Sequence, residues 1–174
     1  MIQLQKFEKA GYAKLISWVE SPEMLMQFAG PGFVFPLTNA QLDQSLSDTN
    51  RFAFTIADTE TGTPVGYAEI NLADESARLA RILIGDKSMR GKGLGTQIVH
   101  LLLDYTFLHF DKTVAELNVF DWNTAAIKCY EKVGFTINPG KRLERKINGE
   151  TWIAINMVID KEKWERQDNH LTSS

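Results

Sequence analysis

The spacing of apolar and polar positions changes its period along the chain. Residues 8–20 place apolar side chains at helical spacing, which predicts a first helix. A second helix is expected to begin at Ser21-Pro22, with serine as the cap and proline in the first turn. A third is expected after Thr38, because Thr38 and Gln41 fit the spacing of a capping box. The N-terminal part of the chain is therefore predicted to be mainly helical.

The period then shortens to two, as in β-strands. Residues 51–58, 65–72 and 77–85 are predicted to be strands, and the turn-rich segments 59–63 and 74–76 separate them. Consecutive strands joined by such short turns form an antiparallel meander.

Helix and strand patterns alternate in the rest of the chain. Asn123 is expected to cap a helix that Gly134 ends, and Asn148-Gly149 is a strong hairpin signal. The elements expected here are a helix over 96–110, a strand over 113–120, a helix over 123–133, a strand from 135 and a returning strand over 151–160. Helices, a meander, strand–helix units and a hairpin together predict an α+β domain with a mixed sheet.

Length and charge narrow the classes of function. The 174 residues suit one domain, expected over 1–164, with a flexible polar tail over 165–174. The net charge of −3 argues against nucleic acid or a membrane surface as the main partner. The sequence shows no signal peptide or membrane segment, and its one cysteine, Cys129, fits a reducing, cytoplasmic compartment.

Metal binding and oligomeric state are the two further properties that bear on the site. No metal site is expected, because His100 and His109 lie nine residues apart on a predicted helix and Cys129 stands alone. The choice between a monomer and a homodimer stays open.

A glycine-rich segment between an apolar strand and an amphipathic helix carries the clearest chemical signal. Its glycines allow the backbone to approach a ligand closely, and its N–H groups can form an anion-binding nest. The helix that follows adds a positive dipole end. The glycines are Gly91, Gly93 and Gly95, and the cations beside them are Lys87, Arg90 and Lys92. The segment predicts a cradle for phosphate groups.

Other phosphate-binding loops fit this segment less well. The nucleotide-triphosphate loop requires Gly-Lys-Ser/Thr, but Lys92 is followed by Gly93. The dinucleotide loop Gly-x-Gly-x-x-Gly fits Gly91 and Gly93 and meets Thr96 at its third glycine, although Asp121 closes the next strand as that fold requires. A dinucleotide enzyme and a plain surface turn remain the weaker alternatives.

Two motifs in this region resemble the GNAT superfamily of acetyl-CoA-dependent N-acyltransferases. The family signature Gln/Arg-x-x-Gly-x-Gly/Ala stands here as Arg90-Gly91-Lys92-Gly93-Leu94-Gly95. A second family segment, an asparagine with a tyrosine seven residues later and then Gly-Phe, stands as Asn123, Tyr130 and Gly134-Phe135. The resemblance covers residues 65–135. It is closest to the branch that acetylates ribosomal-protein N-termini, polyamines and other small amines.

The resemblance implies a single-domain GNAT-like fold, in which helices flank a mixed, mostly antiparallel sheet that splays apart between its fourth and fifth strands. It implies acetyl-CoA as co-substrate, with the pyrophosphate on the glycine-rich loop and the pantetheine arm along the fourth strand. The small side chain of Ala126 leaves room for a ligand on the helix face that Asn123 and Tyr130 share. Residues expected to contact the coenzyme are Leu83, Ile84, Gly85, Arg90, Gly91, Lys92, Gly93, Leu94, Gly95, Thr96, Asn123 and Ala126.

The implied reaction is direct transfer of an acetyl group to a primary amine, in a small molecule or at a peptide N-terminus. A CoA-binding module without catalysis is the alternative. The resemblance makes Tyr130 the acid that protonates the leaving thiolate, and a buried packing residue is its plainer interpretation. Some relatives have a glutamate where this chain has Asn118, so the base stays open between Glu116, Glu69 and water.

The acceptor amine is expected to bind between the N-terminal helices and the last hairpin, around residues 141–149. Aromatic residues from the first part of the chain could line this site, and acidic residues could attract a cationic amine. The aromatic candidates are Trp18, Phe28, Phe33 and Phe35, and the acidic candidates are Glu23 and Glu69.

Overall fold

A single seven-stranded sheet organises the protein. The computed structural model describes residues 1–172, with side chains described to residue 167. The strand order is β1-β2-β3-β4-β5-β7-β6, and every neighbouring pair is antiparallel except the parallel pair β4 and β5. The strands are β1 (Ile2–Lys6), β2 (Arg51–Asp58), β3 (Pro64–Leu72), β4 (Ser76–Ile84), β5 (Val114–Phe120), β6 (Thr136–Ile147) and β7 (Glu150–Asp160). The predicted α+β class and mixed sheet are confirmed.

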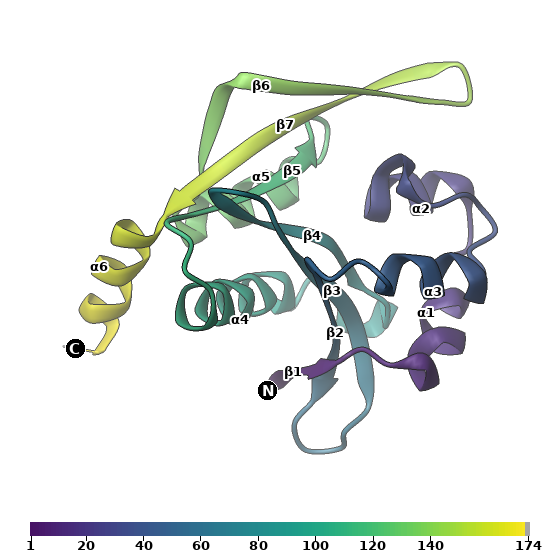
Figure 1. Ribbon diagram of the computed structural model, residues 1–174, viewed down its shortest axis with the longest axis horizontal. Helices are drawn as coiled ribbons and strands as arrows, with labels where there is room; N and C mark the ends of the chain where they lie inside the picture. Colours follow the sequence, from purple (N-terminus) through teal and green to yellow (C-terminus); the bar gives the residue numbers. More distant parts are fainter. Residues whose placement is uncertain (173–174) are drawn as a thin grey trace.

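Two groups of helices lie on either side of the sheet (Figure 1). The α-helices are α1 (Tyr12–Trp18), α2 (Pro22–Ala29), α3 (Asn39–Leu46), α4 (Leu94–His109), α5 (Thr124–Val133) and α6 (Lys161–Thr172), and the 3₁₀ turns are η1 (Lys9–Gly11), η2 (Gly30–Gly32) and η3 (Lys87–Met89). Side chains of α4 and α5 pack in one apolar cluster with the sheet, and side chains of α1, α2 and α3 pack in a second. The sheet thus separates two cores.

The apolar periodicity of the sequence accounts for both cores. Leu102 and Leu103 of α4 are fully buried in the first cluster. In the second, the ring of Tyr67 meets Phe7 edge-on at 4.8 Å between centroids and Phe28 at 5.9 Å. Burial of side chains of this size contributes about 1.5–3 kcal/mol each to the free energy of folding.

The helix caps lie where the sequence places them. The Ser21 hydroxyl accepts a hydrogen bond from the Met24 amide at the start of α2. The Thr38 hydroxyl does the same from Gln41 at the start of α3. Such caps satisfy N–H groups that the helix leaves unpaired.

The sheet divides between β4 and β5. Only three residue pairs join these strands, from Ser76 opposite Val114 to Arg78 opposite Glu116. Beyond Arg78 the two strands continue without pairing, β4 to its end at Ile84 and β5 to its end at Phe120. The two strands therefore form a V whose closed end lies at Arg78 and Glu116. The splayed fourth and fifth strands expected from the resemblance are confirmed.

The N-terminal part differs from the sequence expectation. Residues 2–6 form the edge strand β1, which pairs with β2 from Ile2 opposite Asp58 to Lys6 opposite Phe54. Only Ile2 in this strand is buried, so its sequence shows little apolar alternation. The helix expected over residues 8–20 is shorter, because η1 precedes α1 and Val19 is already extended.

The C-terminal segment continues as helix through much of the expected tail. Trp164 of α6 is buried, packs its ring 5.2 Å from that of Phe107, and donates a hydrogen bond from Nε1 to Asp104 at 3.1 Å. Residues 173–174, the last of the expected tail, lie outside the described residues. In the part of the chain described, no helix is both long and apolar enough to cross a bilayer.

Candidate functional site

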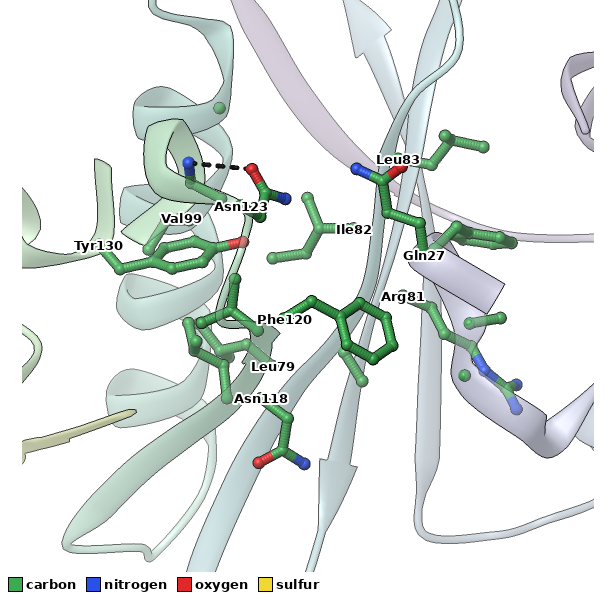
Figure 2. A pocket seen from close by; sticks show the side chains of 18 of the residues that line it. Gln27, Leu79, Arg81, Ile82, Leu83, Val99, Asn118, Phe120, Asn123 and Tyr130 are labelled. Atoms are coloured by element: carbon green, nitrogen blue, oxygen red, sulfur yellow. Dashed lines mark hydrogen bonds between the residues drawn. The ribbon is translucent and has the colours of Figure 1, made fainter. Parts of the chain in front are cut away.

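A cavity of about 830 Å³ fills the gap between the diverging parts of β4 and β5. Residues of α4 and α5 line it from one face of the sheet, and residues of α2 and the hairpin β6–β7 line it from other directions. Figure 2 shows Asn123 facing it from the N-cap of α5, Tyr130 from α5 itself, Ile82 from β4 and Gln27 from α2. The split in the sheet therefore connects its two faces through one continuous space.

The glycine-rich loop presents backbone amides to one end of this cavity. Gly91 and Gly93 both have φ angles of 77°, in the left-handed region that glycine adopts without strain. Gly93 caps α4 without a side-chain hydrogen bond, which leaves the first N–H groups of α4 available to a ligand. These donors, together with the positive end of the helix dipole, suit phosphate oxygens.

The cavity wall includes the expected coenzyme residues except Gly85 and Lys92. A Cβ atom at Gly85 would lie 1.9 Å from the Trp18 ring, so this glycine is required by the packing of the indole against the strand end. Lys92 is exposed beside the loop. Arg90 donates from Nε to the carbonyl of Ile84 at 3.0 Å, which ties the loop to the end of β4.

The asparagine and tyrosine of the second motif face the cavity from α5. Asn123 caps this helix by accepting a hydrogen bond from the Ala126 amide at 3.3 Å, which leaves its amide nitrogen free for a ligand. The Tyr130 ring packs edge-on against Phe135 at 6.1 Å, and its hydroxyl points into the cavity (Figure 2). Both interpretations of Tyr130 thus apply to one residue, whose ring packs and whose hydroxyl faces the cavity.

Burial determines the proton affinity of the Tyr130 hydroxyl. Removal of the ring from water raises the pKa of Tyr130 to about 12, and the neighbouring Cys129 adds a smaller effect in the same direction. The phenol therefore keeps its proton at neutral and moderately alkaline pH.

Glu69 is fully buried and is not part of the cavity wall. Its carboxylate accepts hydrogen bonds from Arg51 Nη1 at 2.6 Å, Arg81 Nη1 at 3.2 Å and the Tyr67 hydroxyl at 2.5 Å. Asn71 Nδ2 lies 3.4 Å from it. A carboxylate held by two guanidinium groups behind the cavity wall has no direct contact with a bound amine, so this position argues against Glu69 among the open alternatives for the base.

Glu116 is also held in ion pairs. It lies opposite Arg78 at the closed end of the V, where it pairs with Arg78 Nε at 3.2 Å and Lys141 Nζ at 3.3 Å. It does not line the cavity. Glu116 thus fastens β4 and β6 to β5, and its ion pairs argue against it among the open alternatives for the base.

Asn118 does line the cavity and presents a donor to it. Its Oδ1 accepts a hydrogen bond from Asn156 Nδ2 at 2.9 Å, and Asn156 in turn accepts one from Asn138 at 3.2 Å. These three residues lie opposite one another in the register of β5, β7 and β6. Because its oxygen is engaged, Asn118 offers the cavity the N–H₂ end of its amide.

A β-bulge shapes the wall that β4 contributes. Tyr67 lies opposite Leu83 and Glu69 opposite Ala80, so β4 has one residue more than β3 over this stretch. Arg81, within the bulge, has a φ angle of 50°, which strains a residue other than glycine. Its guanidinium is fixed by Glu69, by Ser45 at 3.1 Å and by the face of the Phe33 ring at 3.9 Å. Glu69, Ser45 and Phe33 therefore hold the bulge in place through their contacts with Arg81.

The expected acceptor aromatics divide into lining and packing residues. Phe28 lines the cavity, whereas Trp18, Phe33 and Phe35 do not. Glu23 accepts a hydrogen bond of 2.5 Å from Asn148, which joins the start of α2 to the tip of the β6–β7 hairpin. Sequence reasoning missed other polar residues of the cavity wall, which are Gln27, Arg51, Asn71, Arg78 and Arg145.

Comparison with known proteins agrees with this geometry. The chain matches the acetyltransferase (GNAT) family over residues 16–135, more than half of its length. The protein belongs to the GNAT acetyltransferase family. This GNAT protein is 34% identical over 86 residues to aminoglycoside N(6')-acetyltransferase type 1 of Klebsiella pneumoniae, an alignment that covers 42% of this chain and only 43% of the relative. It is 31% identical over 118 residues to spermidine N(1)-acetyltransferase of Escherichia coli, covering 67% of this chain and 62% of the relative.

Solved structures share the fold of this GNAT protein over nearly its whole length. Spermidine N-acetyltransferase from Vibrio cholerae, in complex with CoA and spermine, superposes with a TM-score of 0.78 at 21% identity, covering 94% of this chain and 97% of the other. Aminoglycoside acetyltransferase AAC(6')-Ib, in complex with CoA and kanamycin, gives a TM-score of 0.74 at 22% identity, covering 95% and 98%. The family assignment from the two motifs is confirmed, and the ribosomal-protein branch stays a prediction.

Proposed function

We propose that this GNAT protein is an N-acetyltransferase that moves an acetyl group from acetyl-CoA to a primary amine by direct transfer in a ternary complex. The observation that carries the proposal is the single cavity through the split sheet. Its wall includes the glycine-rich loop, Tyr130 and the polar residues Arg51, Asn71 and Arg78 at the start of the split. Two substrates bound from opposite ends would meet at Tyr130.

The coenzyme end is supported by the chemistry of its donors. The loop amides and the first turn of α4 suit a pyrophosphate, with Arg90 adding a positive charge nearby. The unpaired part of β4 and the Asn123 amide suit the amide groups of a pantetheine arm. Bound there, acetyl-CoA supplies a thioester whose acyl carbon a neutral amine attacks.

Three groups of this chain support the transfer. The bulge in β4 leaves a backbone group outside the β-ladder, and an N–H there can donate to the oxygen on which negative charge develops. Asn118 contributes a second donor from β5. Tyr130 holds a proton that it can give to the departing thiolate.

Deprotonation of the amine is assigned to water. Among the described residues that line the cavity there is no aspartate, glutamate or histidine. A free alkyl amine has a pKa of roughly 10, so the neutral fraction must be drawn from solution or reached through bound water. The rate should therefore rise with pH over the range in which the amine loses its proton.

A panel of primary amines tests this function. Each amine is incubated with acetyl-CoA and the protein, and free thiol is measured over time. Thiol release that depends on both protein and amine supports the proposal, and no release from any amine in a broad panel contradicts it. The second candidate, a CoA-binding module without catalysis, is favoured by the missing carboxylate at Asn118, and it predicts CoA binding without any thiol release.

A further inference from the structure

We infer that the acceptor amine carries a carboxylate, which arginine side chains of the cavity wall recognise. This inference rests on the proposed function and adds a substrate class to it. It sets this chain apart from the relatives named above, whose names specify a polyamine and aminoglycosides.

A row of polar residues crosses the sheet at the closed end of the V. Arg51 lies opposite Asn71, Asn71 opposite Arg78, and Arg78 opposite Glu116 in consecutive strand pairs. Residues opposite one another in a sheet project from the same face, so these four side chains share one surface. The first three line the cavity.

Two buried polar atoms of this row have no hydrogen-bond partner. They are Arg51 Nε and Asn71 Oδ1, which lie on neighbouring strands. The other end of the Arg51 guanidinium is engaged, by Glu69 at 2.6 Å and by Asp48 at 4.0 Å. These two atoms are closed off from the cavity, so a ligand there would meet the charge of the guanidinium and not its Nε. Because Glu69 is shared by Arg51 and Arg81, one buried carboxylate faces two guanidinium groups.

Arg145 supplies a cation that no acidic residue neutralises. It lies on β6, lines the cavity, and makes one hydrogen bond, to the Glu144 carbonyl at 3.2 Å. Within the described part of the chain no carboxylate pairs with it. Arg78 is engaged through Nε alone, so its terminal nitrogens are also available.

The balance of charge in the cavity wall favours an anion. Every charged side chain in that wall is an arginine, and the carboxylates Glu69 and Glu116 lie behind it, committed to arginine partners. A polyamine or aminoglycoside bound here would face these cations without a carboxylate in the wall. A carboxylate would instead accept charge-assisted hydrogen bonds from them.

These arginines are too far from the glycine-rich loop to serve the coenzyme phosphates there. Arg78 and Ile84 are six residues apart on β4, which corresponds to roughly 20 Å along an extended strand. The bulge at Arg81 lies between these two ends. The row therefore belongs to the acceptor side of the reaction centre, and Arg145 faces the cavity from the hairpin whose tip contacts α2.

Matched pairs of amines test the inference. Each pair keeps the amine and replaces one carboxylate by an amide. L-glutamate against L-glutamine tests the side-chain carboxylate, and L-glutamate against its 1-amide tests the α-carboxylate. The C-terminally amidated dipeptides Glu-Ala and Gln-Ala test the side-chain carboxylate at a peptide N-terminus. Spermidine and kanamycin are the cationic comparison. At least one carboxylate substrate should exceed its amide partner in kcat/KM by about tenfold or more, since one charge-assisted hydrogen bond is worth that much.

Variants of β6 identify the cation responsible. Arg145→Gln should reduce the carboxylate preference by about tenfold, and Arg145→Lys should retain part of it. Arg142→Gln removes the same charge from an exposed position of the same strand that does not line the cavity, and it should leave the preference unchanged. Equal losses in both arginine-to-glutamine variants would overturn the assignment of Arg145.

A binding measurement separates failure of this inference from failure of the proposed function. In the presence of CoA, which has no acetyl group to transfer, glutamate should raise the melting temperature more than glutamine does. Turnover of amines with a preference for spermidine or kanamycin would overturn the inference and leave the function intact. Stabilisation by glutamate without turnover of any amine would support the anion site and overturn the acetyltransferase.

Discussion

At the scale of single residues, Tyr130 combines packing with chemistry. We expect Tyr130→Phe to lower kcat by about 10- to 100-fold, below the upper range for a general acid because a thiolate leaves readily. The KM for acetyl-CoA should change less than about twofold, because the ring still packs on Phe135. Steady-state kinetics with a saturating amine measure both values. Tyr105→Phe is the control, because it removes a hydroxyl from α4 outside the cavity wall, and it should retain full activity. Full activity of Tyr130→Phe would mean that another donor protonates the departing thiolate.

The raised pKa of Tyr130 sets the pH dependence. With a pKa of about 12 the phenol stays protonated while the amine substrate loses its proton, so kcat/KM should rise with pH and show no descending limb below about pH 10. The folded protein holds this proton more tightly than the unfolded chain does. The group therefore contributes fully to the free energy of unfolding below about pH 10, and this contribution is lost as the pH rises towards about 12. Rate profiles measured from about pH 6.5 to about pH 10 check the first statement. A descending limb near pH 8 would contradict it.

Two buried or half-buried glutamates should respond differently to the same substitution. Glu69→Gln leaves Arg51 and Arg81 without their counter-charge in a buried cluster, and we expect a loss of about 3–5 kcal/mol in the free energy of unfolding. Glu116→Gln breaks pairs with two partly exposed cations and should cost about 1 kcal/mol or less. Urea denaturation measures both. Glu116→Gln should also keep kcat within about threefold; a loss of 100-fold or more would restore Glu116 as a base.

At the scale of elements, the glycine-rich loop can be tested apart from stability. Gly93→Ala forces a side chain into the left-handed region, at a cost of about 1–2 kcal/mol, and should weaken CoA binding by altering the amides at the start of α4. Gly62→Ala is the matched control, because Gly62 has a φ of 74° and open space around it in the turn between β2 and β3. Denaturation should give similar losses for both, and calorimetry should show weaker CoA binding for Gly93→Ala alone. Equal CoA affinity in the two variants would contradict the assigned role of the loop.

The sequence predicted elements best where one period runs through a long segment. Strands β2 to β4 and helices α4 and α5 follow from apolar spacing and caps, and the loop at Gly91 and Gly93 follows from its position between them. The five-residue edge strand β1 was missed because it buries little. The row of polar residues across the sheet was missed for a different reason. Arg51, Asn71 and Arg78 are 27 residues apart at most, and only strand register brings them into one row.

At the scale of the whole molecule, the net charge of −3 conceals a local excess of cations. The charge balance over the chain argued against a polymeric anion, and the structure gathers arginines around a cavity of about 830 Å³ instead. The β6–β7 hairpin contributes to this arrangement, since Asn148 at its tip donates a hydrogen bond to Glu23 of α2. The cavity wall therefore depends on segments more than a hundred residues apart in sequence.

The split sheet also makes stability sensitive to the coenzyme. Three residue pairs hold β4 to β5, and a ligand that bridges their diverging ends adds contacts that only the folded protein offers. At a concentration of 100 times its Kd, CoA should stabilise the fold by about 2.7 kcal/mol, which corresponds to a rise in Tm of roughly 5–11 °C for a chain of this size. NAD and NADP serve as controls, because they share phosphates with CoA but lack the pantetheine arm. A rise with either dinucleotide and none with CoA or acetyl-CoA, measured by scanning calorimetry, would favour the dinucleotide alternative over the acetyltransferase.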